Sequence, residues 1–225
     1  MYHHGDLAEA VVTWIAESDC LEKVLSIDLE TKVLKKEDFL TGEPILSVSL
    51  AYFKDGKACK KVIVVEDESL EAEGRMFDEL EIFLSQKRPL LLLGYNLCGY
   101  DIPLIHLRLR KHPERIYWGV QDTIDRSFLL DMKHPIRFEL AKYAQDGKPK
   151  ILPLAKVVKH ERWDGLPLMR TKDIVSETQG DKGCEIFRLW KSDREKFLRY
   201  TEGDAHDILL IFRELFKSCL PVTQQ

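Results

Sequence analysis

The sequence predicts an α/β protein with a mixed sheet of five or six strands flanked by helices. Three β-type segments, at about 24–31, 45–53 and 58–66, follow one another on short connections. Such connections favour antiparallel pairing, because a parallel pair needs a long crossover. Residues 69–87 then show helical spacing of apolar side chains and lead into the apolar segment 89–95. A crossover helix followed by a buried parallel strand is the unit that this pattern predicts.

The remaining segments continue the alternation of helices and strands. We expect a helix before the first strand, a helix and a strand after the apolar segment, and two later helical regions: Asp6–Glu17, 103–111, 127–132, 151–160 and 185–217. Ser192 and Glu195 have the spacing of a capping box, which predicts a new helix near residue 193.

The chain contains no internal repeat and no long linker, so a single domain over residues 1–225 is expected. Within it, residues 1–20 would form an extra N-terminal helix and residues 24–217 the core.

Composition excludes several classes of protein. The formal net charge is −4, and no apolar run is long enough to cross a bilayer, which predicts a cytoplasmic protein with no membrane partner. Five cysteines are scattered without Cys-x-x-Cys spacing, so neither a disulfide framework nor a zinc site is indicated.

Two acids interrupt the first predicted strand. Asp28 and Glu30 alternate with apolar residues in Val24–Thr31, so their side chains point to the same face, with Cα atoms roughly 6.5–7 Å apart. Like charges placed together in a core strand generally need a compensating cation. A strand-end pair that faces water is the ordinary alternative for these two residues.

Asn96 and Asp101 follow the apolar strand at a junction between strand and helix. Ligands of open α/β sheets bind outside the carboxyl ends of the strands, so both residues are expected near a site. The alternative for Asp101 is a helix N-cap, since Pro103 falls in the first turn of the helix.

Tyr200 and Asp204 lie four positions apart within a long helical region and therefore share one face of the helix. Apolar residues on or beside that face, Phe197, Ile208, Ile211 and Leu215, suggest that it faces the sheet. A semi-exposed contact between the tyrosine and the aspartate is the alternative.

Taken in order, these segments resemble a known set of motifs. Ile27-Asp28-Leu29-Glu30-Thr31, Tyr95-Asn96-x-x-x-Tyr100-Asp101-Ile102-Pro103 and Tyr200-x-x-x-Asp204 resemble the Exo I, Exo II and Exo III motifs of the DEDD exonucleases, which have a ribonuclease H-like fold. Tyrosine in the third motif is typical of the DEDDy branch. The set is most similar to the proofreading exonuclease domain of family B DNA polymerases, here expected without a polymerase portion.

The resemblance implies a 3′→5′ exonuclease that hydrolyses phosphodiester bonds with two divalent ions, Mg²⁺ or Mn²⁺. The four acids would hold the metals, Tyr200 would orient the attacking water, and four further residues would contact the substrate: Leu29, Thr31, Asn96 and Tyr100. Asp131 matches an acid of the later strand of the family.

The implied partner is single-stranded nucleic acid, with DNA favoured over RNA, and the resemblance leaves room for a replication or repair protein. An exoribonuclease uses the same carboxylates, and a non-catalytic nucleic-acid-binding module can retain the same fold. Basic residues that could flank the nucleic-acid backbone are Arg108, Arg110, Lys111, Lys148, Lys150, Lys156, Lys159 and Arg162.

Overall fold

The centre of the molecule is a five-stranded sheet with the strand order β3-β2-β1-β4-β5. In this computed structural model, residues 4–18, 20–33, 40–175 and 182–219 are described. The strands are β1 (Val24–Thr31), β2 (Ile45–Lys54), β3 (Lys57–Val64), β4 (Leu91–Gly94) and β5 (Phe128–Asp131).

Strand β1 lies in the middle of the sheet, antiparallel to β2 and parallel to β4. Strand β3 pairs antiparallel with β2, and β5 pairs parallel with β4. The prediction of a mixed sheet, antiparallel first and parallel later, is therefore confirmed, with five strands. The pairing of β1 with β2 places Asp28 opposite Ser49 and becomes irregular between Glu30 and Thr31.

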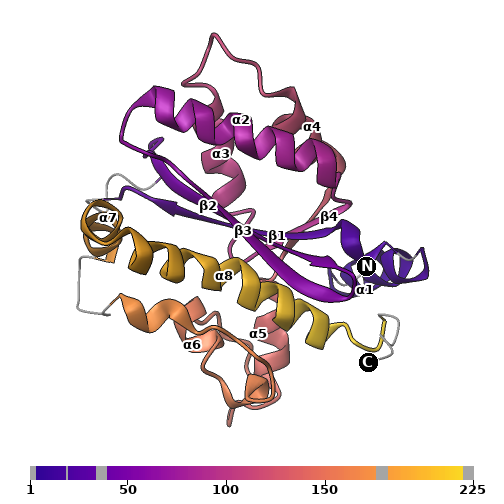
Figure 1. Cartoon of the computed structure of the whole chain (residues 1–225). Helices are drawn as coiled ribbons and strands as arrows, with labels where there is room; N and C mark the ends of the chain where they lie inside the picture. The colour runs from indigo at the N-terminus through magenta and orange to yellow at the C-terminus, as the bar shows by residue number, and fades with distance from the viewer. Residues whose placement is uncertain (1–3, 19, 34–39, 176–181, 220–225) are drawn as a thin grey trace.

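Helices cover both faces of this sheet (Figure 1). The α-helices are α1 (His4–Glu17), α2 (Leu70–Lys87), α3 (Asp101–Leu109), α4 (Trp118–Arg126), α5 (Lys133–Ala141), α6 (Leu154–Val157), α7 (Lys182–Ser192) and α8 (Arg194–Leu215). Short 3-10 helices are η1 (Leu21–Lys23), η3 (Glu161–Trp163) and η4 (Thr171–Ile174).

Two apolar clusters pack against the sheet, whose side chains alternate between its two faces. Helices α2, α3 and α4 lie on one side, where Phe77 and Leu80 of α2 pack in a cluster with Ile27 of β1. Helix α8 crosses the other side, where Ile208 and Phe212 belong to a second cluster. The acids of β1 point toward α8.

A new helix begins near residue 193, as predicted, but with a different capping residue. The side chain of Asp193 accepts a hydrogen bond of 3.0 Å from the main-chain N–H of Lys196. Ser192 instead ends α7, and its hydroxyl donates to the carbonyl of Arg188 at 2.8 Å. A carboxylate is a strong N-cap because it complements the positive end of the helix dipole.

Other helices differ from the prediction. The helix expected over 151–160 is limited to the single turn of α6 and is followed by η3. Helices α4 and α5 were not predicted. Pro135 lies in the first turn of α5, where its missing N–H costs no hydrogen bond.

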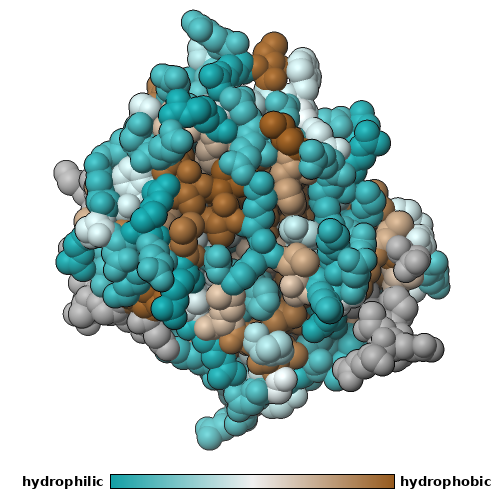
Figure 2. Space-filling model, in the orientation of Figure 1, coloured by the Kyte–Doolittle hydropathy of each residue, from teal (hydrophilic) through white to brown (hydrophobic). Residues whose placement is uncertain are grey.

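Figure 2 shows that the viewed face is largely hydrophilic, with hydrophobic side chains visible mainly between α2 and α8, where β3 lies. Among the helices of the described ranges, none combines the length and the apolar character that a bilayer crossing requires.

Candidate metal centre

Three of the predicted acids converge where the end of β1 meets α8. Asp28, Glu30 and Asp204 each offer a carboxylate oxygen, and these oxygens lie within 4.8 Å of one another. Glu30 is 7% exposed and Asp204 is 4% exposed, while Asp28 is half-buried. The group has the hard oxygen donors that divalent cations prefer, so it could hold a metal ion.

The local structure of each element accounts for this convergence. Asp28 and Glu30 are two residues apart on β1, which directs both side chains to the same face of the sheet. That face is covered by α8, which carries Asp204. On the neighbouring strand, the hydroxyl of Ser49 donates to the carbonyl of Thr201 at 2.7 Å and ties α8 to the sheet.

Gly203 allows a close approach on another side of α8. A Cβ atom at this position would lie 1.9 Å from the hydroxyl oxygen of Thr171. That hydroxyl donates to the carbonyl of Tyr200 at 2.9 Å. Further along the helix, the buried carboxylate of Asp207 accepts the main-chain N–H groups of Met169 and Arg170, at 2.7 and 2.9 Å. The segment 169–171 therefore fixes α8 in the register that places Asp204 beside β1.

Asp101, the fourth predicted acid, lies beside the three-carboxylate group at the start of α3. It is 3% exposed, and its Oδ1 accepts a hydrogen bond of 3.1 Å from the main-chain N–H of Leu29. Burial raises the pKa of Asp101 well above its ordinary value, and the charges of Glu30 and Asp131 raise it further. The hydrogen bond from Leu29 opposes this shift without cancelling it.

Leu29 and Tyr200, two further predicted site residues, are also buried. The side chain of Leu29 is 5% exposed and packs in the apolar core, while its N–H is bound to Asp101. Tyr200 is 0% exposed and lies one helical turn before Asp204, in the same cluster as Phe197 and Trp190. The Leu29 side chain therefore lies in the core and its main-chain N–H beside Asp101, so its contact with substrate stays a prediction, while Tyr200 shares the helix face of Asp204.

Thr31 and Tyr100, expected at the substrate, contact each other. The hydroxyl oxygens of the two residues are 2.8 Å apart, and the hydroxyl of Tyr100 donates to Oε1 of Glu43 at 2.8 Å. Glu43 is 4% exposed. Burial is the largest cause that raises the pKa of Tyr100 well above its ordinary value, so the phenol remains protonated.

Asn96 is held in a second set of polar contacts at the end of β4. Its backbone has a positive φ of 68°, and its N–H donates to Oδ1 of Asp131 at 3.0 Å. The ammonium of Lys133 donates to the side-chain oxygen of Asn96 at 2.7 Å, and the main-chain N–H of Lys133 also binds Asp131, at 3.1 Å. Lys133 thus directs the amide –NH₂ of Asn96 away from itself.

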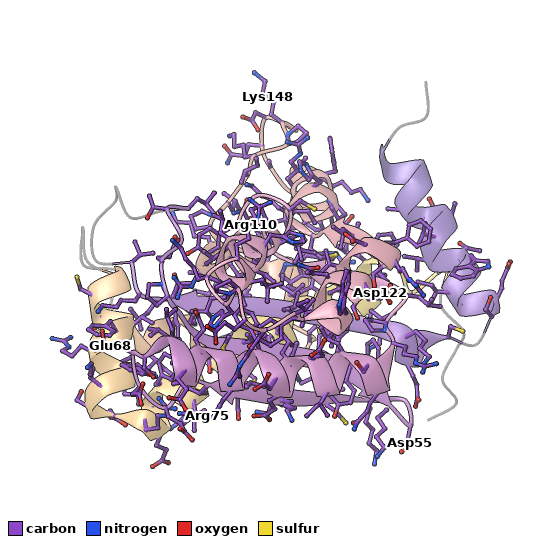
Figure 3. The ribbon with its side chains drawn as sticks, turned by 90° about the horizontal axis from the view of Figure 1, so that it is seen from above. Asp55, Glu68, Arg75, Arg110, Asp122 and Lys148 are labelled. Atoms are coloured by element: carbon purple, nitrogen blue, oxygen red, sulfur yellow. The ribbon has the colours of Figure 1, made fainter. Side chains whose placement is uncertain are left out.

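The basic residues expected to flank nucleic acid are only partly at the surface. Arg108 is 6% exposed and makes a two-pronged ion pair with Glu73, so it is structural. Arg162 is bound to Glu139 and Glu214. By contrast, Lys148 projects from the loop after α5 (Figure 3).

Glu43 and Lys133 are site neighbours that the sequence prediction missed. Glu43 lies in a connection between strands, where an acid is ordinary, and only the distant contact with Tyr100 reveals it. Lys133 did carry a signal, because it follows Asp131 at the same edge of the sheet as Asn96. Ends of parallel neighbouring strands are where polar site residues are expected to gather.

Comparison with solved structures shows a likeness in fold. Neither a protein-family model nor a curated protein matches the sequence. The chain is similar to the solved structure of the family B DNA polymerase from the hyperthermophilic archaeon Pyrobaculum calidifontis, with a TM-score of 0.59 and 17% sequence identity. The similarity covers 85% of this chain and 24% of the polymerase chain, so this chain spans about a quarter of the polymerase. With the observed sheet, this likeness supports the ribonuclease H-like fold implied by the motifs.

Proposed function

We propose that this protein is a metal-dependent 3′→5′ exonuclease of the DEDDy type, which shortens single-stranded or frayed DNA. The observation that carries the proposal is the convergence of Asp28, Glu30 and Asp204, whose oxygens lie within 4.8 Å of one another. Such closely spaced carboxylates repel one another unless a cation compensates their charge. The convergence is therefore better suited to catalysis with metal than to stability alone.

The donor set fits Mg²⁺ or Mn²⁺, which prefer oxygen ligands, better than Zn²⁺, which more often takes histidine or cysteine. When bound, two such ions would activate water for attack and stabilise charge on the leaving oxygen. Asp28, Glu30 and Asp204 would hold one ion, and Asp28 with Asp101 would support the other. The raised pKa of Asp101 favours its protonated form in the metal-free protein, so cations and protons compete at this carboxyl.

Tyr200 would act on the attacking water by a hydrogen bond. A phenol with a pKa near 10 is a poor base at neutral pH and a good hydrogen-bond partner. Its place one turn before Asp204 on α8 supports this role. Replacement by phenylalanine keeps the buried ring and removes only the hydroxyl.

Asn96 and Thr31 are the proposed contacts of the substrate strand. Because the oxygen of the Asn96 side chain accepts from Lys133, its –NH₂ group can donate to a phosphate oxygen. The backbone beside Thr31 would hold the 3′-terminal sugar. A nucleotide must leave a duplex to reach buried groups such as Glu30, so unpaired 3′ ends are the expected substrates.

The proposal is tested with a 5′-labelled oligonucleotide incubated with Mg²⁺, Mn²⁺ or a chelator. We expect a ladder that shortens from the 3′ end, faster on a single strand than on a blunt duplex. Chelator and Asp28→Ala should each abolish it. Asp122→Ala is the matched control, because that carboxylate lies on the surface of α4, where it pairs with Arg126.

Activity that persists in chelator and in Asp28→Ala would assign hydrolysis to another site or to a contaminant. The same assay on RNA distinguishes a DNA exonuclease from an exoribonuclease, since a site that contacts the 2′-hydroxyl favours ribose over deoxyribose. Binding of the oligonucleotide without shortening under any metal would favour a non-catalytic binding module.

A further inference from the structure

We infer that Glu43 is a positioning residue, whose buried carboxylate acts through Tyr100 and Thr31 to fix the direction of Glu30 at the metal centre. The inference rests on the proposed function, in that it takes Glu30 as a metal ligand. It concerns a residue outside the three sequence motifs.

Regular strand pairing holds Glu30 on one side only. Glu30 still pairs in register with Ser47 of β2, and the register shifts between Glu30 and Thr31. Such irregularities redirect the side chains next to them. The contacts that hold Thr31 therefore help to set the direction of Glu30.

The hydroxyl group of Thr31 is held from the side of α3. It lies 2.8 Å from the hydroxyl of Tyr100, which in turn donates to Glu43 at 2.8 Å. Asp101, which follows Tyr100 in the sequence, accepts a hydrogen bond from the main-chain N–H of Leu29. Two contacts from the start of α3 therefore hold β1 on either side of Glu30.

Further hydrogen bonds hold the carboxylate of Glu43 in place. Its Oε1 also accepts the main-chain N–H of Leu40, at 3.1 Å, and its Oε2 accepts that of Gly42, at 3.2 Å. Such contacts to an ionised carboxylate are the stronger kind of hydrogen bond. The carboxylate has little freedom to follow Tyr100 if the tyrosine moves.

The backbone around Glu43 is pinned as well. The guanidinium of Arg108 donates to the carbonyl of Gly42 at 2.6 Å, and Glu73 accepts the N–H of Ile45 at 3.1 Å. Arg108 and Glu73 form a buried ion pair at 2.6 Å. In addition, the N–H of Lys32 donates to the carbonyl of Pro44 at 2.9 Å, so the segment that holds Glu43 runs directly beside the end of β1.

The experiment measures the dissociation constant of Mn²⁺ by calorimetry or by electron paramagnetic resonance, without nucleic acid. We expect Glu43→Leu, which removes the acceptor oxygens at similar size, and Tyr100→Phe each to weaken Mn²⁺ binding about tenfold, the lower end of the range for residues that orient metal ligands. The double variant should bind no more weakly than the single variants, because both changes break one chain of contacts. On a Glu30→Gln background, Glu43→Leu should have no further effect.

Tyr117→Phe is the matched control. Its hydroxyl is also buried and donates to the carbonyl of Gly74 of α2 at 3.1 Å. This change should lower the melting temperature and leave Mn²⁺ affinity unchanged. A purely structural role of Glu43 would give the same result as this control.

The outcomes separate this inference from the proposed function. A wild-type protein that binds Mn²⁺ and degrades DNA, with unchanged Mn²⁺ affinity in Glu43→Leu and Tyr100→Phe, overturns the positioning role alone. Additive effects of the two changes also overturn it. A wild-type protein that neither binds Mn²⁺ nor degrades nucleic acid overturns both.

Discussion

Asp101 accepts a 3.1 Å hydrogen bond from the main-chain N–H of Leu29 while its carboxyl group is 3% exposed. Burial raises the pKa of this carboxyl well above its ordinary value, so the folded state binds its proton more tightly than the unfolded state does. Stability of the metal-free protein should therefore fall as the pH rises from about 4 through the folded pKa.

Asp101→Asn should remove this pH-dependent cost, because an amide oxygen can still accept from Leu29. In chelator at pH 8 we expect the melting temperature to rise by about 2–4 °C, the shift that 1 kcal/mol gives at this chain length. Near pH 4 the variant and the wild type should melt together. A melting temperature of Asp101→Asn below that of the wild type at pH 8 would contradict the argument; Asp122→Asn, at the surface, is the control.

Gly203→Ala should disturb the helix that carries Asp204. The added Cβ would overlap Thr171, so the helix or the segment must shift, at a cost of about 1–3 kcal/mol in the free energy of unfolding. Mn²⁺ affinity should fall as well, since the shift lies one residue from Asp204. Gly165→Ala is the control, because a Cβ there meets nothing within 4 Å. If Gly203→Ala and Gly165→Ala had the same stability and the same Mn²⁺ affinity, α8 would accommodate the added Cβ without a cost, contrary to this prediction.

Arg162 joins α5 to α8 through Glu139 and Glu214, at 2.7 and 3.1 Å. Burial alone would raise the pKa of each glutamate, but hydrogen bonds from Arg162 and the neighbouring lysines lower it overall. A lowered carboxyl pKa stabilises the folded state at any pH above the ordinary pKa of a glutamate. This contribution is lost as the pH falls through the lowered pKa. Arg162→Met should therefore lower the free energy of unfolding by about 1 kcal/mol at pH 7 and by less at pH 3. Urea titration at the two pH values measures this difference.

Lys133→Met should weaken binding of a single-stranded oligonucleotide while leaving the fold intact. Loss of the ammonium removes a cation beside Asn96 and frees the amide to turn. We expect about a tenfold loss of affinity at low salt in Ca²⁺, and a shallower dependence on salt, by fluorescence anisotropy. Lys150→Met is the control, since that lysine pairs with Asp146 on an outer loop. Identical salt slopes for Lys133→Met and wild type would remove Lys133 from the interface.

Local patterns in the sequence were sufficient for the elements that build the sheet. Strand β1 was predicted at its observed bounds because alternating apolar residues mark it, and its two acids stood out against that pattern. The convergence of Asp204 with them followed from helix spacing combined with a family resemblance. Local chemistry also located a new helix near 193, although the cap is Asp193.

Local sequence patterns could not predict the contacts between segments that are distant in the sequence. The bond from Leu29 to Asp101 and the chain from Thr31 to Glu43 join residues whose local sequence gives no sign of each other. Arg108 looked like a surface cation, since arginine is rarely buried, and only the three-dimensional pairing with Glu73 explains its place.

The three-carboxylate group draws Asp28 and Glu30 from β1 and Asp204 from α8. A ribosome must therefore add all the residues between these two elements before the third carboxylate exists. Translation products that stop short of α8 can offer only a pair of acids. If metal-dependent hydrolysis requires the whole group, the growing chain is inactive, and cleavage begins only after α8 has docked.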